Sequence, residues 1–266
     1  LNKLLKHIKA KIMIDGNVEK QLKQLEVFSD QEFNVAFKDV WTDLIRTAQP
    51  NQENPVGFVT GGAPGSGKSS FIMEAKEQFN KNIIIVNGDE FRIYHPRFNE
   101  IASLAKGDFP TYTGSFSGKM VEKVISEAIK QRYNIIVEGT FRTADTPIKT
   151  LKDMKASGYK TIVKVKAVNA DVSWQSTIDR FNDMKSMGLE PRAVNKLVFD
   201  KTVNGLAENT YKVTISGVAD QVEVWNRQIK LFDSRLGNVQ NLQNIIQKEL
   251  GVLKEVSKLM SKGFSK

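Results

Sequence analysis

Apolar residues in the first part of the chain recur every three or four positions, which is the spacing of one face of a helix. The pattern extends from residue 1 to about residue 47 and predicts helices that precede the main core. Its apolar positions are Leu4, Leu5, Ile8, Ile12, Phe33, Val35, Phe37, Val40, Trp41, Leu44 and Ile45. A polar, proline-flanked stretch, residues 49–55, follows and predicts a connector to the rest of the chain.

From residue 56 onward, short apolar runs alternate with segments of helical spacing. The predicted strands are residues 56–60, 83–86, 135–137 and 161–168, and the predicted helices are residues 68–79, 118–131, 147–157 and 170–187. Apolar strands that alternate with helices of this length favour a parallel sheet, because the crossover helices cover both of its faces. The predicted fold class is therefore α/β, with a parallel sheet and helices on both faces.

A break in the helical pattern follows the fourth of these helices. Residues 186–192 contain Gly188 and Pro191, two residues that interrupt helices. We interpret this stretch as a lid turn, with another helix after it at about residues 193–203.

The last part of the chain combines a hairpin pattern with a return to helical spacing. Alternating apolar residues around Asn226-Arg227-Gln228 predict a hairpin over residues 221–233, whereas residues 211–215 fit a helix or a strand equally well. Helical spacing resumes from Leu236. The predicted parts are an N-terminal helical segment at residues 1–55, a core at residues 56–235 with a lid near residues 180–195, and a C-terminal helical segment at residues 236–266.

Composition narrows the class of protein. The chain has 266 residues, of which 40% are hydrophobic, so a sizeable core is expected. The chain has no cysteine, which excludes disulfides and thiolate metal sites. No apolar run approaches the roughly 20 residues of a membrane helix. We therefore expect a cytoplasmic protein with no membrane partner.

The net charge of +9 favours an anionic partner. The basic residues are scattered along the chain, however, and no basic stripe is interleaved with aromatic residues. Most of them are interpreted as solvated surface, and a nucleic-acid partner is not expected.

A glycine-rich motif lies between the first predicted strand of the core and the helix after it. Its sequence is Gly61-Gly62-Ala63-Pro64-Gly65-Ser66-Gly67-Lys68-Ser69, and it fits the P-loop pattern from Gly62 to Ser69. Glycine lets backbone N–H groups approach phosphates closely, while Lys68 reaches the β- and γ-phosphates and Ser69 holds Mg²⁺. The predicted nucleotide-binding residues are Gly62, Ala63, Pro64, Gly65, Ser66, Gly67, Lys68, Ser69 and Ser70.

Two carboxylates follow predicted strands on the same side of the sheet. Asp89 comes one helix and one strand after Lys68, and Glu138 ends the next apolar strand. Because successive parallel strands present their carboxyl ends on one side, both acids are expected beside the phosphates. Asp89 is the candidate base on an acceptor hydroxyl, or a Mg²⁺ ligand, or a cap of the following turn. Glu138 is a candidate Mg²⁺ ligand or a partner of Arg142 or of a lysine, and the residues alone leave open which acid is the base.

Two arginines, Arg180 and Arg192, flank the predicted lid. A lid that closes over a nucleotide brings permanently charged guanidinium groups to the γ-phosphate, where negative charge spreads during transfer. His95, one of two histidines, follows the candidate base and is interpreted as a structural or substrate-positioning residue.

Taken together and in order, these motifs resemble the zeta toxin family of bacterial toxin–antitoxin systems. The resemblance covers about residues 56–204, and beyond that range the terminal helices match only in general character. Besides the P-loop, it rests on Asn87-Gly88-Asp89-Glu90-Phe91-Arg92, His95-Pro96, Val137-Glu138-Gly139-Thr140-Phe141-Arg142-Thr143, Thr177-Ile178-Asp179-Arg180-Phe181 and Pro191-Arg192-Ala193.

The resemblance implies a P-loop kinase that uses ATP and Mg²⁺ to phosphorylate the 3′-hydroxyl of the amino sugar of UDP-N-acetylglucosamine, which blocks cell-wall precursor synthesis. It implies a small helical antitoxin that covers the nucleotide site. The implied roles are phosphate contact by Lys68, Mg²⁺ binding by Ser69 and Glu138, base catalysis by Asp89, γ-phosphate stabilisation by Arg180 and Arg192, and substrate contact by Asp89, Glu122, Glu138, Arg142 and Thr150.

Three other functions stay open on the residues. The first is a P-loop kinase of another hydroxyl, on an antibiotic or a polynucleotide end. The second is a nucleotide-dependent switch, although Asn195-Lys196-Leu197-Val198 lacks the aspartate of a guanine-reading motif. The third, suggested only by the charge of +9, is a nucleotide-dependent nucleic-acid-binding protein.

Overall fold

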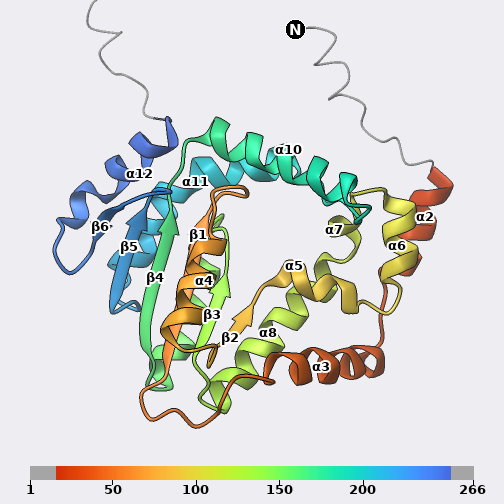
Figure 1. Cartoon of the computed structure of the whole chain (residues 1–266), viewed down its shortest axis with the longest axis horizontal. Coiled ribbons are helices and arrows are strands. Elements are labelled where there is room, and N and C mark those ends of the chain that lie inside the picture. Colours follow the sequence, from red (N-terminus) through yellow and green to blue (C-terminus); the bar gives the residue numbers. More distant parts are fainter. Residues whose placement is uncertain (1–15, 253–266) are drawn as a thin grey trace, which may run out of the picture.

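The computed structural model describes residues 16–252 (Figure 1). The predicted apolar face at Leu4, Leu5, Ile8 and Ile12, and the end of the predicted C-terminal helical segment, lie outside these residues. Within them, a central sheet is surrounded by helices. The helices are α2 (Gly16–Leu25), α3 (Asp30–Leu44), α4 (Ser69–Gln78), α5 (Gly88–Phe91), α6 (Phe98–Ala105), α7 (Phe109–Tyr112), α8 (Gly114–Lys130), α9 (Asp145–Ala156), α10 (Ala170–Ser186), α11 (Lys196–Ile215) and α12 (Leu242–Leu250), with 3₁₀ turns η1 (Arg92–Tyr94) and η2 (Val239–Asn241).

The sheet has six strands in the order β2-β3-β1-β4-β5-β6. Their bounds are β1 (Val56–Gly62), β2 (Ile84–Val86), β3 (Ile135–Glu138), β4 (Lys160–Lys166), β5 (Gln221–Trp225) and β6 (Lys230–Asp233). The first five strands are parallel, and β6 runs antiparallel to β5. The α/β prediction is confirmed, and so is the predicted hairpin, which adds the antiparallel edge.

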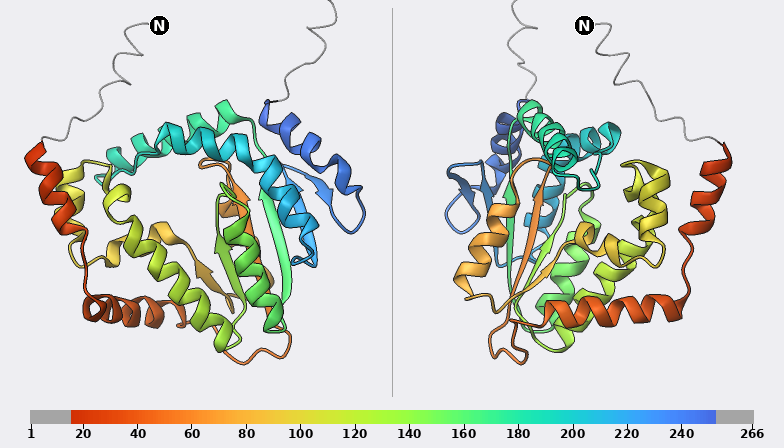
Figure 2. Two further views of the ribbon diagram at one scale, coloured as in Figure 1. Left: turned by 180° about the vertical axis from the view of Figure 1, so that it is seen from behind. Right: turned by 45° about the vertical axis from the view of Figure 1, so that its right-hand side comes forward.

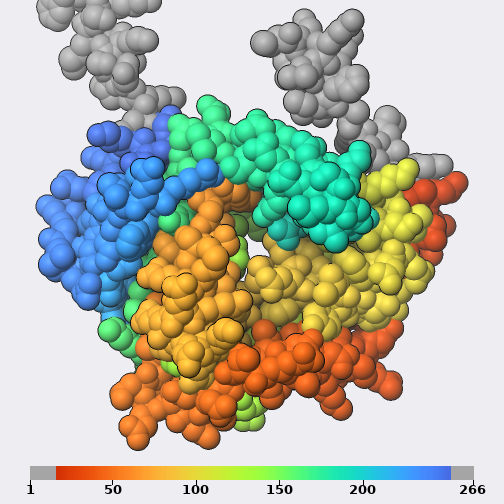
Figure 3. Space-filling view, in the orientation of Figure 1, coloured from red at the N-terminus to blue at the C-terminus, as the bar shows by residue number. Residues whose placement is uncertain are grey.

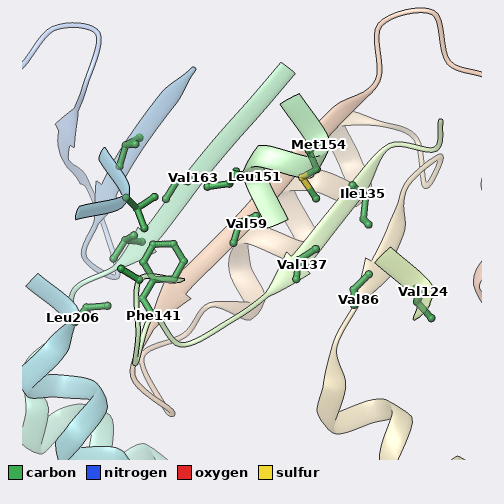
Figure 4. Close-up of a cluster of buried hydrophobic side chains, with 14 of the residues drawn as sticks. Val59, Val86, Val124, Ile135, Val137, Phe141, Leu151, Met154, Val163 and Leu206 are labelled. Carbon is green, nitrogen blue, oxygen red and sulfur yellow. The ribbon is translucent and has the colours of Figure 1, made fainter. Parts of the chain in front are cut away.

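Neighbouring side chains of β1 point to opposite faces of the sheet and are buried in different hydrophobic clusters. Phe58 packs with Phe71 and Ala75 of α4, whereas Val59 belongs to the larger cluster that α8, α9 and α11 cover. Figure 2 shows these three helices on the face opposite α4. Figure 4 shows Val59, Val137 and Met154 within the larger cluster. Helices on both faces therefore follow from the side-chain alternation of buried parallel strands.

Helices from outside the predicted core range complete the same cluster. Phe33 and Val40 of α3 and Leu242 and Ile246 of α12 are buried within it. The start of α3 is fixed by a capping box, in which Ser29 and Glu32 each bond the other's backbone N–H. The predicted division at residues 55 and 235 stays a prediction, since these helices and the sheet share one core.

The helix expected at residues 118–131 begins four residues earlier, at Gly114, and two other boundaries differ more from the prediction. The helix expected at residues 193–203 continues to Ile215, so the ambiguous stretch 211–215 is helical, and Val213 joins the buried face that includes Phe199 and Leu206. The last helix begins at Leu242 rather than near Leu236, whose side chain is 90% exposed. An exposed leucine gives no burial energy to a helix start, which explains the later beginning.

None of the helices between residues 16 and 252 has the length and apolar character needed to cross a membrane. The expected cytoplasmic location stays a prediction.

Candidate functional site

A cavity of about 580 Å³ opens where β1, β2 and β3 end. Figure 3 shows the molecule hollowed between the orange surface around α4, the teal end of α10 and the yellow surface of α5 and α6. The cavity lies where a parallel sheet presents its strand ends, as the sequence predicted. Its lining residues are Pro64, Gly65, Gly67, Lys68, Ser69, Asn87, Gly88, Asp89, Arg92, Ser117, Glu138, Gly139, Thr140, Ser176, Arg180 and Arg192.

The P-loop forms one wall of this cavity and needs glycine for its shape. Gly65 has a φ of +77°, and a Cβ there would lie 2.1 Å from the carbonyl oxygen of Ser173. Gly62 has a φ of +143°, with the carbonyl oxygen of Lys166 at 2.8 Å from the Cβ position. Any side chain at these two positions would both strain the backbone and collide with a neighbouring main chain.

Lys68 lies at the end of the loop, directly before α4, and is 7% exposed. Its Nζ donates to the carbonyl oxygens of Gly62 and Ala63, at 2.9 and 3.0 Å. Burial lowers the pKa of Lys68 to about 8, against an opposing influence from Glu138. A phosphate group beside this ammonium would favour its charged form.

The predicted nucleotide-binding residues divide into two groups. Pro64, Gly65, Gly67, Lys68 and Ser69 line the cavity, whereas Gly62, Ala63, Ser66 and Ser70 are not part of its lining. Ala63 and Ser66 are buried, and Ser70 donates its hydroxyl to the carbonyl of Gly67 at 3.0 Å. The second group therefore shapes the loop from behind.

Asp89 is held at the start of the short helix α5. The side chain of Asn87 caps this helix by accepting the backbone N–H of Asp89 at 3.1 Å. Arg92 Nε lies 3.0 Å from Asp89 Oδ1, and Arg192 Nη1 lies 2.8 Å from Oδ2. The alternative in which Asp89 itself caps the turn is excluded, because Asn87 supplies that cap.

Glu138 ends β3 and lines the cavity beside Lys68. Burial raises the pKa of its carboxyl, with Lys68 acting in the opposite direction. Within residues 16–252 no hydrogen bond or ion pair joins Glu138 to Arg142, so the proposed pairing of the two is not seen. The carboxylate stays available to a cation or a hydroxyl in the cavity.

Arg180, on α10, is the second lid arginine that reaches the cavity. Burial lowers its pKa, and nearby Arg192 acts in the same direction, but a guanidinium stays charged in proteins. Its buried Nε has no hydrogen-bond partner among the described residues. A buried, unpaired donor beside the P-loop is what an anionic ligand would satisfy.

Three predicted substrate residues lie outside the cavity lining. Glu122 on α8 and Arg142 after β3 are exposed, and Thr150 on α9 is half-buried. Their substrate contacts stay a prediction. His95 also lies outside this lining and is buried against Phe28 and Phe116, with its Nδ1 accepting the backbone N–H of Arg97 at 3.1 Å. That placement supports the structural role for His95.

Several cavity residues had not been assigned a role from the sequence. Arg92 follows Asp89 by one helical turn, a spacing that indicates an ion pair and would have identified it. No sequence pattern marks Ser117 and Ser176, because whether they face the cavity depends on how α8 and α10 are rotated about their axes. Thr140 and Gly139 follow directly from the end of β3.

The donors in this site fit a magnesium ion that is shared with phosphates. Among residues 16–252 no group of three or more His, Cys, Asp or Glu side chains forms a metal site of its own. Mg²⁺ is commonly bound by one or two protein oxygens together with substrate phosphates. The Ser69 hydroxyl and the Glu138 carboxylate, which makes no hydrogen bond or ion pair within residues 16–252, could supply such oxygens, and their binding of Mg²⁺ stays a prediction.

Comparison with known proteins identifies relatives over most of the chain. A family model described as zeta toxin matches residues 39–236. Toxin zeta of Streptococcus pyogenes is 34% identical over 209 residues, which are 78% of this chain and 72% of that protein. Toxin PezT of Streptococcus pneumoniae serotype 4 is 30% identical over 240 residues, which are 89% of this chain and 94% of that protein.

Solved structures give the same result for the fold. A structure from the characterisation of the PezAT chromosomal toxin–antitoxin system of S. pneumoniae matches with a TM-score of 0.76 and 28% identity, over 89% of this chain and 95% of that chain. A complex of AvrRxo1-ORF1 with ORF2 and ATP matches with a TM-score of 0.52 and 15% identity, over 90% of this chain and 73% of that chain. At that identity the second match shows a shared fold.

Proposed function

The chain belongs to the zeta toxin family, and from this premise we propose that it is an ATP-dependent kinase that phosphorylates UDP-N-acetylglucosamine. The observation that supports the proposal most is the cavity that unites a P-loop lysine, a strand-end aspartate and two lid arginines. A binding loop alone serves many functions. Lys68, Asp89, Arg180 and Arg192 around one cavity meet the specific needs of phosphoryl transfer.

The proposed reaction transfers the γ-phosphoryl group of ATP to a sugar hydroxyl. The hydroxyl oxygen forms a bond to the γ-phosphorus, and the bond from that phosphorus to the β,γ-bridging oxygen breaks. Its electron pair leaves with ADP, and the hydroxyl proton passes to Asp89. In a loose transition state, orientation of the hydroxyl by Asp89 matters more than its prior deprotonation.

The cations around the cavity would stabilise the charge that spreads over the transferred group. Lys68 exchanges its loop carbonyls for phosphate oxygens, and the unpaired Nε of Arg180 gains an acceptor. Mg²⁺, when bound by Ser69 and Glu138 with the phosphates, supplies further positive charge. The burial of Lys68 strengthens its interaction with a phosphate, because water screens it little.

The proposed acceptor is the 3′-hydroxyl of the amino sugar of UDP-N-acetylglucosamine, and it rests on membership of the family. The loop after β3 would form the wall of the cavity that contacts the acceptor, since Thr140 lines the cavity and Arg142 is two residues further on. Asn209 of α11 donates to the carbonyl of Phe141 at 2.9 Å, and the Phe141 ring packs against Gly61. These contacts fix the loop, and we propose that Glu122, Arg142 and Thr150 contact the substrate beyond it.

The proposed partner is a small helical antitoxin that covers the nucleotide site. The relative PezT comes from the PezAT toxin–antitoxin system, and the cavity of this chain opens on the face of the molecule that Figure 3 shows. Phosphorylated UDP-N-acetylglucosamine would be withdrawn from cell-wall precursor synthesis, which accounts for toxicity in the absence of such a partner.

A panel of acceptors tests the proposed substrate. ATP consumption should rise with UDP-N-acetylglucosamine and stay near background with an aminoglycoside, with a polynucleotide that has a free 5′-hydroxyl, and with nucleic acid that carries no such end. UDP-glucose is the matched control, because it differs only in carrying a hydroxyl in place of the acetylated amine. Turnover with another acceptor but not with UDP-N-acetylglucosamine would replace this proposal with a kinase of that hydroxyl.

A further inference from the structure

The two oxygens of the Asp89 carboxylate are held by arginines from different parts of the fold. Arg92, one helical turn after Asp89, lies 3.0 Å from Oδ1 through its Nε. Arg192, beyond the end of α10, lies 2.8 Å from Oδ2 through its Nη1. The two contacts differ in how firmly each arginine is anchored.

Arg92 is anchored to the corner between α7 and α8. Its Nη1 donates to the carbonyl of Pro110 and to the hydroxyl of Thr113, each at 3.0 Å. Thr113 is fully buried, and its hydroxyl donates in turn to the carbonyl of Phe109 at 2.8 Å. The planar guanidinium therefore links Asp89 to a rigid corner through a continuous chain of hydrogen bonds.

The same corner also holds the backbone beside Asp89. Ser117, in the first turn of α8, donates its hydroxyl to the carbonyl of Gly88 at 2.5 Å. The side chain of Arg92 is only 16% exposed, so water weakens its pairing with Asp89 less than it would at the surface. Both the main chain and the side chain of Asp89 are thus fixed from α7 and α8.

Arg192 has a different setting. It lies in the segment between α10 and α11, and among residues 16–252 its side chain is paired with Asp89 alone. The next residue, Ala193, donates its backbone N–H to the carbonyl of Gly107 at 3.2 Å, which rests the lid on the connection between α6 and α7. Within the described part of the chain, no anchor comparable to the buried Thr113 fixes this guanidinium.

We propose that Arg92 is a positioning residue that holds Oδ1 of Asp89 throughout the reaction, and that Oδ2, once Arg192 releases it, is the oxygen that accepts the proton. The inference rests on the proposed kinase function. An acceptor hydroxyl and Arg192 compete for the same oxygen, so Arg192 moves to the transferring phosphoryl group when the hydroxyl arrives. Arg192 then neutralises either Asp89 or the phosphoryl group, and Arg92 holds the carboxylate in the same orientation in both states.

Substitutions at Arg92 and Thr113 test this inference. Arg92→Gln should lower kcat by about 10²-fold, because the Asp89 carboxylate is no longer held in its orientation. KM for ATP and for the acceptor should change less than about twofold. Thr113→Val should lower kcat by about fivefold, which corresponds to one ordinary hydrogen bond, and should have no further effect when Arg92 is already glutamine. Thr113→Ser keeps the hydroxyl and should retain wild-type kcat.

Arg97→Gln is the matched control, because Arg97 also pairs with a carboxylate, Glu32, at 2.7 Å, but outside the cavity. It should leave kcat within about twofold of wild type even where the thermal midpoint falls. Equal multiplicative effects of the Thr113 change in both backgrounds, or raised KM values at unchanged kcat, would overturn the inference. If Arg92→Gln does not fold, the kcat values of the two Thr113 variants decide. A lower kcat for Thr113→Val with a wild-type kcat for Thr113→Ser supports the inference, and equal kcat values for the two overturn it.

Each variant is assayed for phosphorylation of UDP-N-acetylglucosamine and for growth arrest on expression. Growth arrest by wild type without phosphorylation of this sugar would reject the proposed acceptor alone. The ranking of the variants in growth arrest then still decides the role of Arg92. Full rescue of kcat by Arg92→Lys would also contradict the inference, because one ammonium lacks the fork that joins Asp89 to Pro110 and Thr113.

Discussion

Replacement of Asp89 by alanine should abolish phosphoryl transfer while ATP binds with nearly unchanged affinity. The expected fall in kcat is about 10²- to 10⁴-fold, the range for loss of a positioned acid or base. ATP affinity should persist because the triphosphate is held by the P-loop, in which Asp89 has no part. Single-turnover product formation and nucleotide titration measure the two effects separately.

The control for this change is Asp153→Ala on α9. The Asp153 carboxylate pairs with Lys149 Nζ at 3.0 Å on the surface. Asp153→Ala should therefore change neither product formation nor nucleotide affinity. Substantial turnover by Asp89→Ala would remove Asp89 from the role of base and leave Glu138 as the remaining carboxylate of the cavity.

Replacement of Lys68 by alanine should weaken the interaction with the triphosphate and remove growth arrest on expression. The loss of this buried cation should lower kcat by about 10²- to 10³-fold, as for one removed donor to the transition state. Lys149→Ala, on the exposed surface of α9, is the matched control. Full growth arrest by Lys68→Ala would show that toxicity arises elsewhere in the molecule.

Stability measurements separate this effect from misfolding. Without nucleotide, the thermal midpoint of Lys68→Ala should stay within about 4 °C of wild type. The variant loses hydrogen bonds to two loop carbonyls, but it also removes a buried charge whose pKa is lowered to about 8. The increase in midpoint on addition of Mg-ATP should be smaller than for wild type, since that increase follows affinity.

The sequence predicted that Lys68, Asp89 and Glu138 lie close together, and the structure places all three in one cavity lining. Lys68 follows β1, Asp89 follows β2 and Glu138 ends β3, so strand order and direction alone bring them together. Arg180 and Arg192 were identified by the turn that separates α10 from α11. These positions depend on topology, which the alternation of apolar segments shows.

Other features depend on packing that a linear pattern does not contain. Ser117 and Ser176 reach the cavity through the rotation of α8 and α10, and Arg92 through its anchor on the α7–α8 corner. The length of α11 was underestimated because its C-terminal part, residues 211–215, has an apolar pattern that suits either a helix or a strand. The burial of Val213 in the larger cluster, on the same helix face as Phe199 and Leu206, selects the helix.

The substrate side is where sequence and structure give least agreement. Glu122, Arg142 and Thr150 were placed by family resemblance, and the structure leaves all three outside the cavity lining. A contact that forms only with a nucleotide-sugar present depends on the ligand as well as on the chain. Experiments on the acceptor therefore carry more weight than experiments on these three residues.

A mass spectrum of the products is the most direct test of the central claim. The protein is incubated with Mg-ATP and UDP-N-acetylglucosamine, with the Asp89→Ala variant as the control. The account predicts a product heavier than UDP-N-acetylglucosamine by one phosphoryl group, with fragmentation placing the phosphate on the amino sugar, and no such product from the variant. Unmodified UDP-N-acetylglucosamine after incubation with active wild-type protein would contradict it.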